Sequence, residues 1–512
     1  MNLLIHRRDL RINDNKIINS NKLEKIPIFI FDPIQIDKKI NEYFSNNLVM
    51  FLCETLLELN NEYKEYNSNL QIFYGDTIKV LKDIIKNNSI ENIMFNIDYS
   101  PYSKKRDKNI ENLCEKNDIN VLTEEDMLLI PIKSEYGLAP SSNEPYKVFT
   151  PFMKNLKKYD VDKPKKSTTE FSKKKLISKY SIDIDSINRF YKYNDNLHVK
   201  PGRKEGLKLL KAIKKQNNYD KCRNFLTYQT TNLSAYINLG VLSIREVYEK
   251  IENKLGKKSG IINELYWRDF YYNILYHYPH IVGNSFKKKY DKIKWSKNKK
   301  NFVKWCNGET GYPIVDACMK QLNTTGYMHN RGRMIVSSFL TKDLQIDWRW
   351  GEKYFATQLV DYNISANNGG WQWSAGTGTD AQPYFRIFNP WTQSEKFDSE
   401  CKYIKKWLPV LEDIPNKEIH KWYKFSSNYD IDYPEPMVDH SIERENIQQK
   451  IEEIESKMEG NKISNLQEEM RDLDSELSEL QSEITGMEEE RENQVADTRE
   501  LELKLKNLGT AS

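Results

Sequence analysis

Aromatic residues and proline divide the chain into two unlike parts. All 10 Trp, 31 Tyr and 20 Phe lie at or before Tyr433, and the last proline is Pro436. Residues 441–512 carry 9 basic and 20 acidic side chains, whereas residues 1–440 have a net charge of +15. A hydrophobic core needs bulky apolar side chains, so we expect ordinary globular domains only in the first part. Its positive charge favours partners that carry phosphate groups.

The composition argues against a membrane or secreted protein. Mean hydropathy is −0.75, and no apolar run approaches the length of about 18 residues that a membrane helix needs. After Met1 and Asn2 only three apolar residues precede His6, Arg7 and Arg8, so a signal peptide is not expected. The six cysteines lack the spacing of a metal site and are predicted to be reduced packing residues. We therefore expect a soluble intracellular protein without a metal; the sequence does not distinguish cytoplasm from nucleus.

The first 130 residues alternate strand-like and helix-like runs. The predicted strands are Leu3–Ile5, Ile26–Phe31, Leu70–Tyr74 and Ile93–Ile97, and the predicted helices are Asn47–Tyr63, Thr77–Lys86 and Lys104–Lys116. Such alternation predicts an α/β domain with a doubly wound parallel sheet covered by helices on both faces. A GxGxxG run after the first strand is absent, so a nicotinamide fingerprint is not predicted.

Three further regions follow this α/β domain of residues 1–130. Residues 131–200 are rich in Lys, Ser, Asp and proline, which predicts an irregular connector on the surface. Residues 201–440 return to helical patterns with many Trp and Tyr, which predicts an all-α second domain. Residues 441–512 form an acidic extension with heptad spacing.

The heptad stripe of the extension predicts a long helix or coiled coil. Its members are Leu466, Met470, Leu473, Leu477, Leu480, Ile484 and Met487, with Leu501, Leu505 and Leu508 later; an earlier stripe out of phase comprises Ile447, Ile451, Ile454 and Met458. One such helix cannot bury its own stripe. We expect a homo-oligomer or another coiled-coil partner, with a disordered tail as the alternative.

Two runs in the second domain contain residues suited to chemistry. Glu264 and Trp267 are three residues apart and share a helix face, which alone would fit an ordinary amphipathic helix. The run 367–373 (Asn-Asn-Gly-Gly-Trp-Gln-Trp) adds adjacent glycines, amides and indoles. Glycine admits close approach of a flat ligand, and amides and indoles provide hydrogen bonds and stacking. Together the two runs predict a ligand-binding cavity.

Several runs in a fixed order resemble the photolyase/cryptochrome family, and most closely its class I cyclobutane pyrimidine dimer DNA photolyases. They are 327–334 (Tyr-Met-His-Asn-Arg-Gly-Arg-Met), 346–349 (Ile-Asp-Trp-Arg), 367–373 and 384–390 (Tyr-Phe-Arg-Ile-Phe-Asn-Pro), with 7–11 (Arg-Arg-Asp-Leu-Arg) near the amino terminus. The resemblance extends to about His440 and leaves the acidic extension outside it.

The resemblance implies that the helical domain binds FAD. The positions that match the family's cofactor-binding residues are Tyr219, Thr230, Thr231, Asn232, Leu233, Ser234, Arg333, Asp361, Tyr362, Asn363 and Asn367. Asn367 matches the residue that faces flavin N5, where cryptochromes of plants and animals tend to carry Asp or Cys, so it favours repair. Asn363 replaces an acidic residue of the family, which removes one negative charge near the flavin.

The resemblance also implies a lesion cavity and a DNA surface. Catalytic positions match at Glu264, Trp267, Asn330, Met334 and Trp373, and DNA-binding positions at Arg223, Glu264, Trp267, Arg268, Asn330, Arg331, Arg386 and Gln393. Photolyases specific for the (6-4) photoproduct carry histidines where this chain has Asn330 and Met334, so cyclobutane dimers are expected. We expect a buried Glu264 with a raised pKa that donates to a dimer carbonyl.

Trp295, Trp348 and Trp371 match the family's electron-transfer tryptophans, and Trp305 is an alternative outer member. Ser103 and Val282 stand where folate-binding relatives carry an acid and a lysine, so methenyltetrahydrofolate is not expected at that site. A deazaflavin, another flavin or no antenna chromophore are the open alternatives.

The resemblance thus implies light-dependent DNA repair by a deoxyribodipyrimidine photo-lyase. In such an enzyme light-excited reduced FAD passes an electron to a flipped-out dimer in UV-damaged DNA, and the dimer splits into monomers. The alternative is a cryptochrome-type photoreceptor that signals through the carboxy-terminal coiled coil.

Overall fold

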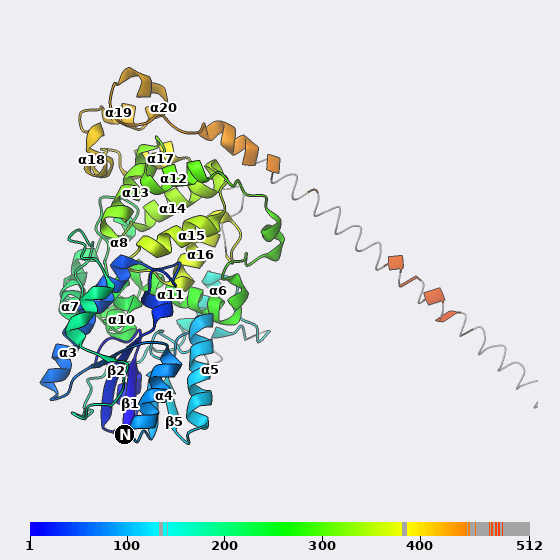
Figure 1. Cartoon of the computed structure of the whole chain (residues 1–512). Helices are drawn as coiled ribbons and strands as arrows, with labels where there is room; N and C mark the ends of the chain where they lie inside the picture. The colour runs from blue at the N-terminus through cyan, green and yellow to red at the C-terminus, as the bar shows by residue number, and fades with distance from the viewer. Residues whose placement is uncertain are drawn as a thin grey trace, which may run out of the picture. The chain divides into compact units, whose positions relative to one another are not determined.

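The computed structural model describes residues 1–132, 137–140, 142–380, 387–447 and 449–450, together with isolated positions between 456 and 484. The chain forms two compact units, Met1–Arg444 and Glu445–Ser512. The first unit contains a sheet domain and a helical domain, and residues of both take part in its functional regions (Figure 1). None of the helices in the described part of the chain combines the length and apolar character that a membrane span requires.

A six-stranded sheet with the order β5-β4-β1-β2-β3-β6 organises the first domain. Its strands are β1 (Asn2–His6), β2 (Lys25–Phe31), β3 (Gln71–Tyr74), β4 (Asn92–Asn96), β5 (Asn120–Glu124) and β6 (Ser181–Ile182). The first five pair in parallel, with Leu3 opposite Ile26 on one side and Ile93 on the other. The four predicted strands are therefore confirmed, whereas β5 and β6 were not predicted.

Helices cover both faces of this sheet, as predicted. The helices of the domain are α1 (Lys16–Asn19), α2 (Pro33–Ile36), α3 (Asn46–Glu65), α4 (Thr77–Asn87) and α5 (Pro101–Glu115). Alternate strand residues point to opposite faces, so Leu4 and Phe29 join a core with α3, while Leu3 and Ile28 join another with α4 and α5. The side chains of Ser45, Asp76 and Ser100 cap the amino ends of α3, α4 and α5.

The predicted irregular connector is more structured than expected. It contains α6 (Phe149–Leu156), strand β6 and the 3₁₀ helix η2 (Ile184–Phe190), and β6 pairs antiparallel with β3 at the sheet edge. Phe152, Phe171 and Ile187 are buried in the core beside α3. Scattered apolar residues of this kind show no period that a sequence pattern could detect, because each is positioned by contacts with distant segments.

The second domain is helical, as predicted, and carries the site. Its α-helices are α7 (Arg203–Lys211), α8 (Tyr219–Cys222), α9 (Ser234–Asn238), α10 (Ile244–Leu255), α11 (Gly260–His277), α12 (Lys299–Asn307), α13 (Pro313–Thr325), α14 (Asn330–Ser338), α15 (Trp348–Gln358), α16 (Ile364–Ala375), α17 (Pro390–Phe397), α18 (Lys402–Trp407), α19 (Asn416–Ile419) and α20 (Trp422–Phe425). Short 3₁₀ helices are η3 (Ala212–Gln216), η4 (Pro279–Ile281), η5 (Lys288–Lys292), η7 (Pro409–Leu411) and η8 (Ser426–Asn428), and η6 (Phe339–Asp343) is a short π-helix.

A buried ion network joins the two domains. Asp126, which follows β5, accepts hydrogen bonds from Arg11 and from Arg245 of α10, and Arg245 also binds Asp14 at 3.1 Å. These charges are almost fully shielded from solvent. Burial opposes ionisation of Asp126, but the two guanidinium groups outweigh it and lower the pKa of the carboxyl. The network fixes α10 and its neighbours against the sheet domain.

Half of the heptad stripe lies outside the described residues: Leu466, Met487, Leu501, Leu505 and Leu508, as do Ile451, Ile454 and Met458 of the earlier stripe. Met470, Leu473, Leu477, Leu480 and Ile484 are described; each is helical and has an apolar side chain that is 50–64% exposed. The coiled coil therefore remains a prediction.

Candidate functional site

A cavity of about 590 Å³ lies within the helical domain. Residues from α8, α11, α14 and α16 line it, together with the segment between α8 and α9. The predicted residues that share this lining are Tyr219, Arg223, Thr230, Thr231, Leu233, Ser234, Glu264, Trp267, Arg268, Asn330, Arg331, Arg333, Met334, Asp361, Asn363, Asn367, Trp371 and Trp373. Residues more than 150 positions apart in sequence thus meet around one hollow.

An ion pair stands on one wall of this cavity. Arg333 Nη2 of α14 lies 3.0 Å from Asp361 Oδ2, and the hydroxyl of Ser234 donates to the same carboxylate at 2.7 Å. Arg333 also donates through Nε to the Met328 carbonyl at 2.8 Å. The guanidinium is therefore fixed on two sides, with one positive and one negative group presented together.

Asn363 begins α16 and connects the cavity wall to the sheet domain. Its Oδ1 accepts from the backbone amides of Ser365 and Ala366, and its Nδ2 donates to Asn238 Oδ1 at 3.0 Å and to the Tyr272 hydroxyl. Arg8 donates to these same two groups. An amide at position 363 can cap the helix and donate at once, whereas an ionised carboxylate can only accept.

The two adjacent glycines of α16 have different roles. A Cβ on Gly369 would lie 2.2 Å from the Tyr271 ring, so this glycine permits α16 to pack closely on α11. A Cβ on Gly370 would meet nothing within 4 Å, and Gly370 lines the cavity. Gly370 therefore leaves room for a ligand, whereas the space beside Gly369 is filled by the Tyr271 ring of α11.

The indoles predicted to hold a lesion also line this cavity. Trp267 of α11 stacks on Phe149 with ring centroids 3.7 Å apart, so Phe149 supports one face of the indole. Trp373 of α16 lines the same cavity, as do Asn330 and Met334, one helical turn apart on α14. Phe149 belongs to the connector and was not among the predicted site residues, because no local pattern marks it.

Glu264 is less buried than predicted and has a basic partner. Its side chain is 41% exposed and forms an ion pair with Arg223, which is 43% exposed. Desolvation within the cavity raises the pKa of Glu264, while the ion pair with Arg223 acts in the opposite direction and only partly offsets it. The predicted direction of the pKa shift is thus retained, but Arg223 shares the carboxylate.

Other predicted residues lie outside the lining of this cavity. Asn232 adopts a left-handed backbone with φ of 53°, and its Oδ1 accepts a hydrogen bond from His198 Nε2 at 3.1 Å. Tyr362 lines a second cavity, and Gln393 lies on α17 away from both. Arg386 lies outside the described residues.

The three predicted electron-transfer tryptophans lie on connected segments. The ring of Trp371 contacts α15 at Gly351, one turn after Trp348, and the backbone of Ser296, next to Trp295, pairs with the segment 345–346. Trp348 and Trp371 are buried, and Trp295 is half-buried. Trp305 is fully buried, and its ring centroid lies 6.0 Å from that of Trp371. It therefore cannot be the outer tryptophan at the surface.

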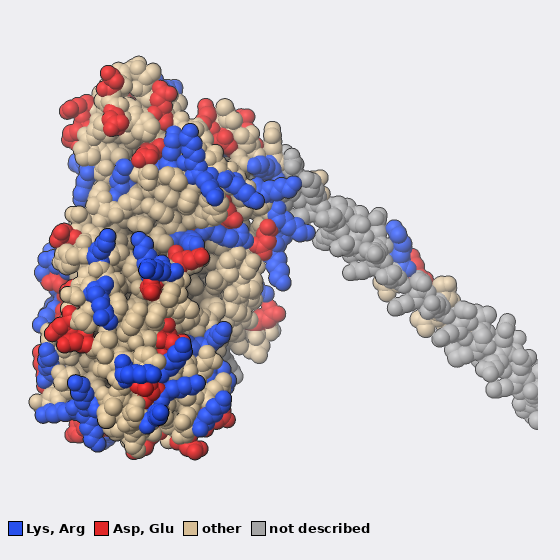
Figure 2. Space-filling model, viewed as in Figure 1, with Lys and Arg blue, Asp and Glu red and all other residues tan. Residues whose placement is uncertain are grey.

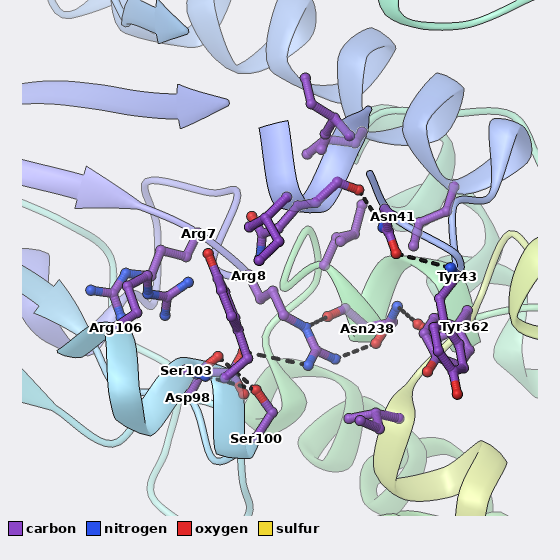
Figure 3. Close-up of a pocket in the computed structure, with 18 of the residues that line it drawn as sticks. Arg7, Arg8, Asn41, Tyr43, Asp98, Ser100, Ser103, Arg106, Asn238 and Tyr362 are labelled. Atoms are coloured by element: carbon purple, nitrogen blue, oxygen red, sulfur yellow. Dashed lines mark hydrogen bonds and ion pairs between the residues drawn. The ribbon is translucent and has the colours of Figure 1, made fainter. Parts of the chain in front are cut away.

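A second cavity of about 440 Å³ lies at the carboxyl ends of the strands, where open α/β sheets bind ligands. Its floor is apolar, with Phe29, Phe31 and Leu52 among the lining residues. Figure 3 shows Arg7 and Arg106 at one end, Tyr43 and Tyr362 at the other, and Arg8 with Asn238 between them. Apart from Ser103 and Val282, which the family resemblance singled out, the sequence analysis did not predict the lining of this cavity, which is built from residues of both domains.

The two ends of the second cavity differ in chemistry, because one carries arginines and the other carries tyrosines. Burial and the nearby Arg106 lower the pKa of Arg7 to about 10, although Asp107 binds it at 2.7 Å. Tyr43 and Tyr362 stack with ring centroids 6.4 Å apart. Ser103 and Val282, the positions without the folate-holding acid and lysine, line this same cavity.

The fold and the first cavity define a flavoprotein class with an α/β domain followed by a helical cofactor domain. A family model described as DNA photolyase matches residues 2–169, and one described as the FAD binding domain of DNA photolyase matches residues 261–453. The chain belongs to the DNA photolyase family.

Comparison with individual proteins agrees with this family. The chain is 34% identical to the deoxyribodipyrimidine photo-lyase of Escherichia coli, over 86% of this chain and 96% of that protein. It is 37% identical to a Sulfolobus tokodaii photolyase whose crystal structure holds two FAD molecules, with a TM-score of 0.79 over 88% of this chain and 99% of that one. A Synechocystis cryptochrome is 25% identical, with a TM-score of 0.81 over 88% of this chain and 98% of that one.

The residues around the first cavity fit FAD. Hydroxyl groups of Thr230, Thr231 and Ser234 suit phosphate and ribose oxygens, the Arg333–Asp361 pair suits the polar edge of a flavin, and the open space at Gly370 admits a flat ring. FAD is the cofactor of this chain.

Proposed function

We propose that this chain is a light-dependent DNA repair enzyme, a deoxyribodipyrimidine photo-lyase, that splits cyclobutane pyrimidine dimers. One observation carries the proposal: Glu264, Trp267, Asn330, Met334 and Trp373 line the same cavity as the Arg333–Asp361 pair and Asn367. A lesion seated among the first group would lie beside a cofactor held by the second.

The chemistry supplied by reduced FAD, when it is bound, is the transfer of one electron to the dimer after absorption of light. Placement and electrostatics are the tasks of the chain itself. Trp267, supported by Phe149, and Trp373 present flat apolar faces to the joined pyrimidines. A dimer is poorly stacked in DNA, so extruding it costs less than extruding intact bases.

Glu264 is proposed to bind the dimer as a protonated acid. The raised pKa of its carboxyl favours the form that can donate a hydrogen bond to a pyrimidine carbonyl. Arg223, its present partner, is then free to turn toward a backbone phosphate, a contact that Arg268 and Arg331 at the cavity would reinforce.

The second cavity is proposed to hold a flavin-type antenna chromophore. The similar Sulfolobus tokodaii photolyase contains two FAD molecules, with the implication of a novel light-harvesting cofactor in that protein. In this chain, the apolar floor and the stacked tyrosines Tyr43 and Tyr362 suit a flat ring, and the hydroxyls of Ser100 and Ser103 suit its polar edge. Among the alternatives, we favour another flavin over a deazaflavin or an empty cavity.

The acidic extension is proposed to associate with a second copy of the chain. The exposed apolar side chains at Met470, Leu473, Leu477, Leu480 and Ile484 follow a spacing of three and four residues that pairs helices.

The decisive test mixes purified, reduced protein with a dimer-containing oligonucleotide under blue light and follows recovery of pyrimidine absorbance. Recovery in light but not in the dark is expected. If FAD is bound and reduced and no recovery occurs, the repair assignment is wrong, and a cryptochrome-type photoreceptor becomes the better interpretation of the fold.

A further inference from the structure

The segment 287–300 carries an unusual density of positive charge. It contains eight lysines, all exposed, and a single acid, Asp291: the lysines are Lys287, Lys288, Lys289, Lys292, Lys294, Lys297, Lys299 and Lys300. In Figure 2, Lys and Arg side chains crowd the right-hand edge of the globular body, where this segment runs in Figure 1. We call these residues the lysine segment.

Nothing described within the fold neutralises the lysine segment. Asp291 binds Arg349 at 2.9 Å, and among the ion pairs between described residues none includes any of the eight lysines. Like charges at this density repel one another, and an arrangement of this kind raises the local concentration of anionic partners. A surface that served only solubility would gain as much from mixed charges.

Trp295 lies in the middle of the lysine segment. Its indole is half-buried, whereas the flanking Lys294 and Lys297 are exposed. Ser296 donates its backbone N–H to the Gln345 carbonyl at 2.7 Å, which anchors the segment three residues before Trp348. The lysine segment thus surrounds the point where the proposed electron route reaches the surface.

The lysine segment is separate from the lesion cavity. None of its eight lysines is among the residues that line that cavity, where Arg223, Arg268 and Arg331 provide the positive charge. The lesion cavity therefore has basic residues of its own, and the lysine segment is available to a different anionic partner.

We propose that the lysine segment is the docking surface for an acidic one-electron carrier protein that reduces Trp295. The proposal rests on the proposed function, because Trp295 is oxidised only when light drives an electron from it through Trp348 and Trp371 to oxidised FAD. The carrier then gives one electron to the oxidised indole and is itself oxidised by one electron. No covalent bond forms or breaks. Lys294 and Lys297 hold acidic groups of the carrier beside the indole and shorten the transfer distance.

Complementary charge affects mainly the rate of encounter and its salt dependence. Two measurements therefore test the docking surface. The first is the binding of a reduced acidic [2Fe–2S] ferredoxin, used as a probe, to the FAD-loaded protein in the dark at low and high salt. The second is the decay of the tryptophan radical absorbance after a laser flash, as a function of the concentration of the probe.

The variant Lys294→Glu/Lys297→Glu reverses the charge beside Trp295, and Lys174→Glu/Lys175→Glu is the matched control at exposed lysines of the connector. We expect the charge reversal to weaken ferredoxin binding and to slow the ferredoxin-dependent decay by about tenfold or more at low salt. The control should behave like the parent protein. Reduced cytochrome c, a basic carrier, should show the opposite response to the charge reversal.

Two outcomes would overturn the docking proposal. One is ferredoxin binding and radical decay that are the same in both variants. The other is a loss of affinity for dimer-containing DNA in Lys294→Glu/Lys297→Glu without any change toward ferredoxin, which would assign the lysine segment to nucleic acid. Repair by chemically reduced protein is measured in parallel, so failure of the proposed function is distinguished from failure of docking. If no tryptophan radical forms, the binding of ferredoxin in the dark still tests whether the lysine segment is the docking surface.

Discussion

The side-chain amide of Asn367 on α16 is bound to Glu352 on α15: Asn367 Nδ2 lies 2.9 Å from Glu352 Oε1 and 3.0 Å from the Glu352 carbonyl oxygen. Because the amide nitrogen donates to Glu352, the amide oxygen remains available to a ligand in the cofactor cavity that Asn367 lines. Glu352 itself lines the second cavity. The Glu352 carboxyl thus lies between the two cavities and positions the residue proposed to face flavin N5.

The titration of Glu352 should produce a pH-dependent step in the midpoint potential of bound FAD. Burial raises the pKa of its carboxyl to about 7, with the hydrogen bond from Asn367 opposing the shift. Above pH 7 the ionised carboxylate adds a negative charge near the flavin, so the midpoint potential of bound FAD should fall as pH rises through 7. Glu352→Gln should remove this step and keep the potential of the protonated form. Spectroelectrochemical titration from about pH 5 to 9 measures it.

The same group affects folding. Because the folded-state pKa lies above that of an exposed glutamate, the carboxyl favours the folded state at low pH and opposes it as pH rises from about 4.5 to 7. Melting curves of Glu352→Gln should therefore depend less on pH over this range. Glu412→Gln, at an exposed position, is the control. An unchanged pH profile of both potential and melting temperature in Glu352→Gln would contradict the role of Glu352.

Glu264→Gln and Glu264→Ala should lower the yield of repaired dimers several-fold while FAD remains bound. Both changes remove the acidic proton, but glutamine keeps an amide donor, so it should retain more repair than alanine. In the parent protein, repair should decline as pH rises through the raised pKa of Glu264, because the donor form is lost. Full repair by Glu264→Ala at every pH would exclude this residue from dimer binding.

Trp371→Phe should block photoreduction of oxidised FAD and leave repair by chemically reduced protein intact. Trp371 is the one proposed electron-transfer residue that lines the cofactor cavity, so the proposed route enters the cavity there. Absorbance of FAD under blue light with an added thiol measures photoreduction. Trp305→Phe is the matched control, since Trp305 is equally buried and packs on Trp371. If Trp371→Phe photoreduces at the parent rate, the route is wrong.

Asp126→Ala should destabilise the first unit by about 3–5 kcal/mol, because it leaves the buried guanidinium groups of Arg11 and Arg245 without their shared carboxylate. Denaturant unfolding followed by tryptophan fluorescence measures the change. Asp413→Ala, at an exposed position, should stay near the parent value. Equal stability of the two variants would show that the network contributes little.

Deleting residues 445–512 should convert an oligomer to a monomer with unchanged cofactor binding. This segment forms the second compact unit and carries the exposed apolar stripe, so the first unit retains all residues of both cavities. Light scattering reports the mass, and flavin absorbance confirms that the shortened protein is folded. If the protein has the mass of a monomer both before and after the deletion, self-association through this segment is contradicted.

Local periodicity was enough to predict the alternation of strands and helices and the helical second domain, and long motifs were enough to predict most residues of the first cavity. Both signals depend only on residues that are close together in the sequence. Three other features depend on packing: Glu352 holds Asn367, Arg8 reaches Asn238 across 230 residues, and a second cavity opens between the domains. Such contacts join side chains that share no local pattern. They arise only when the packing of distant helices on the sheet brings their donors and acceptors within hydrogen-bond distance.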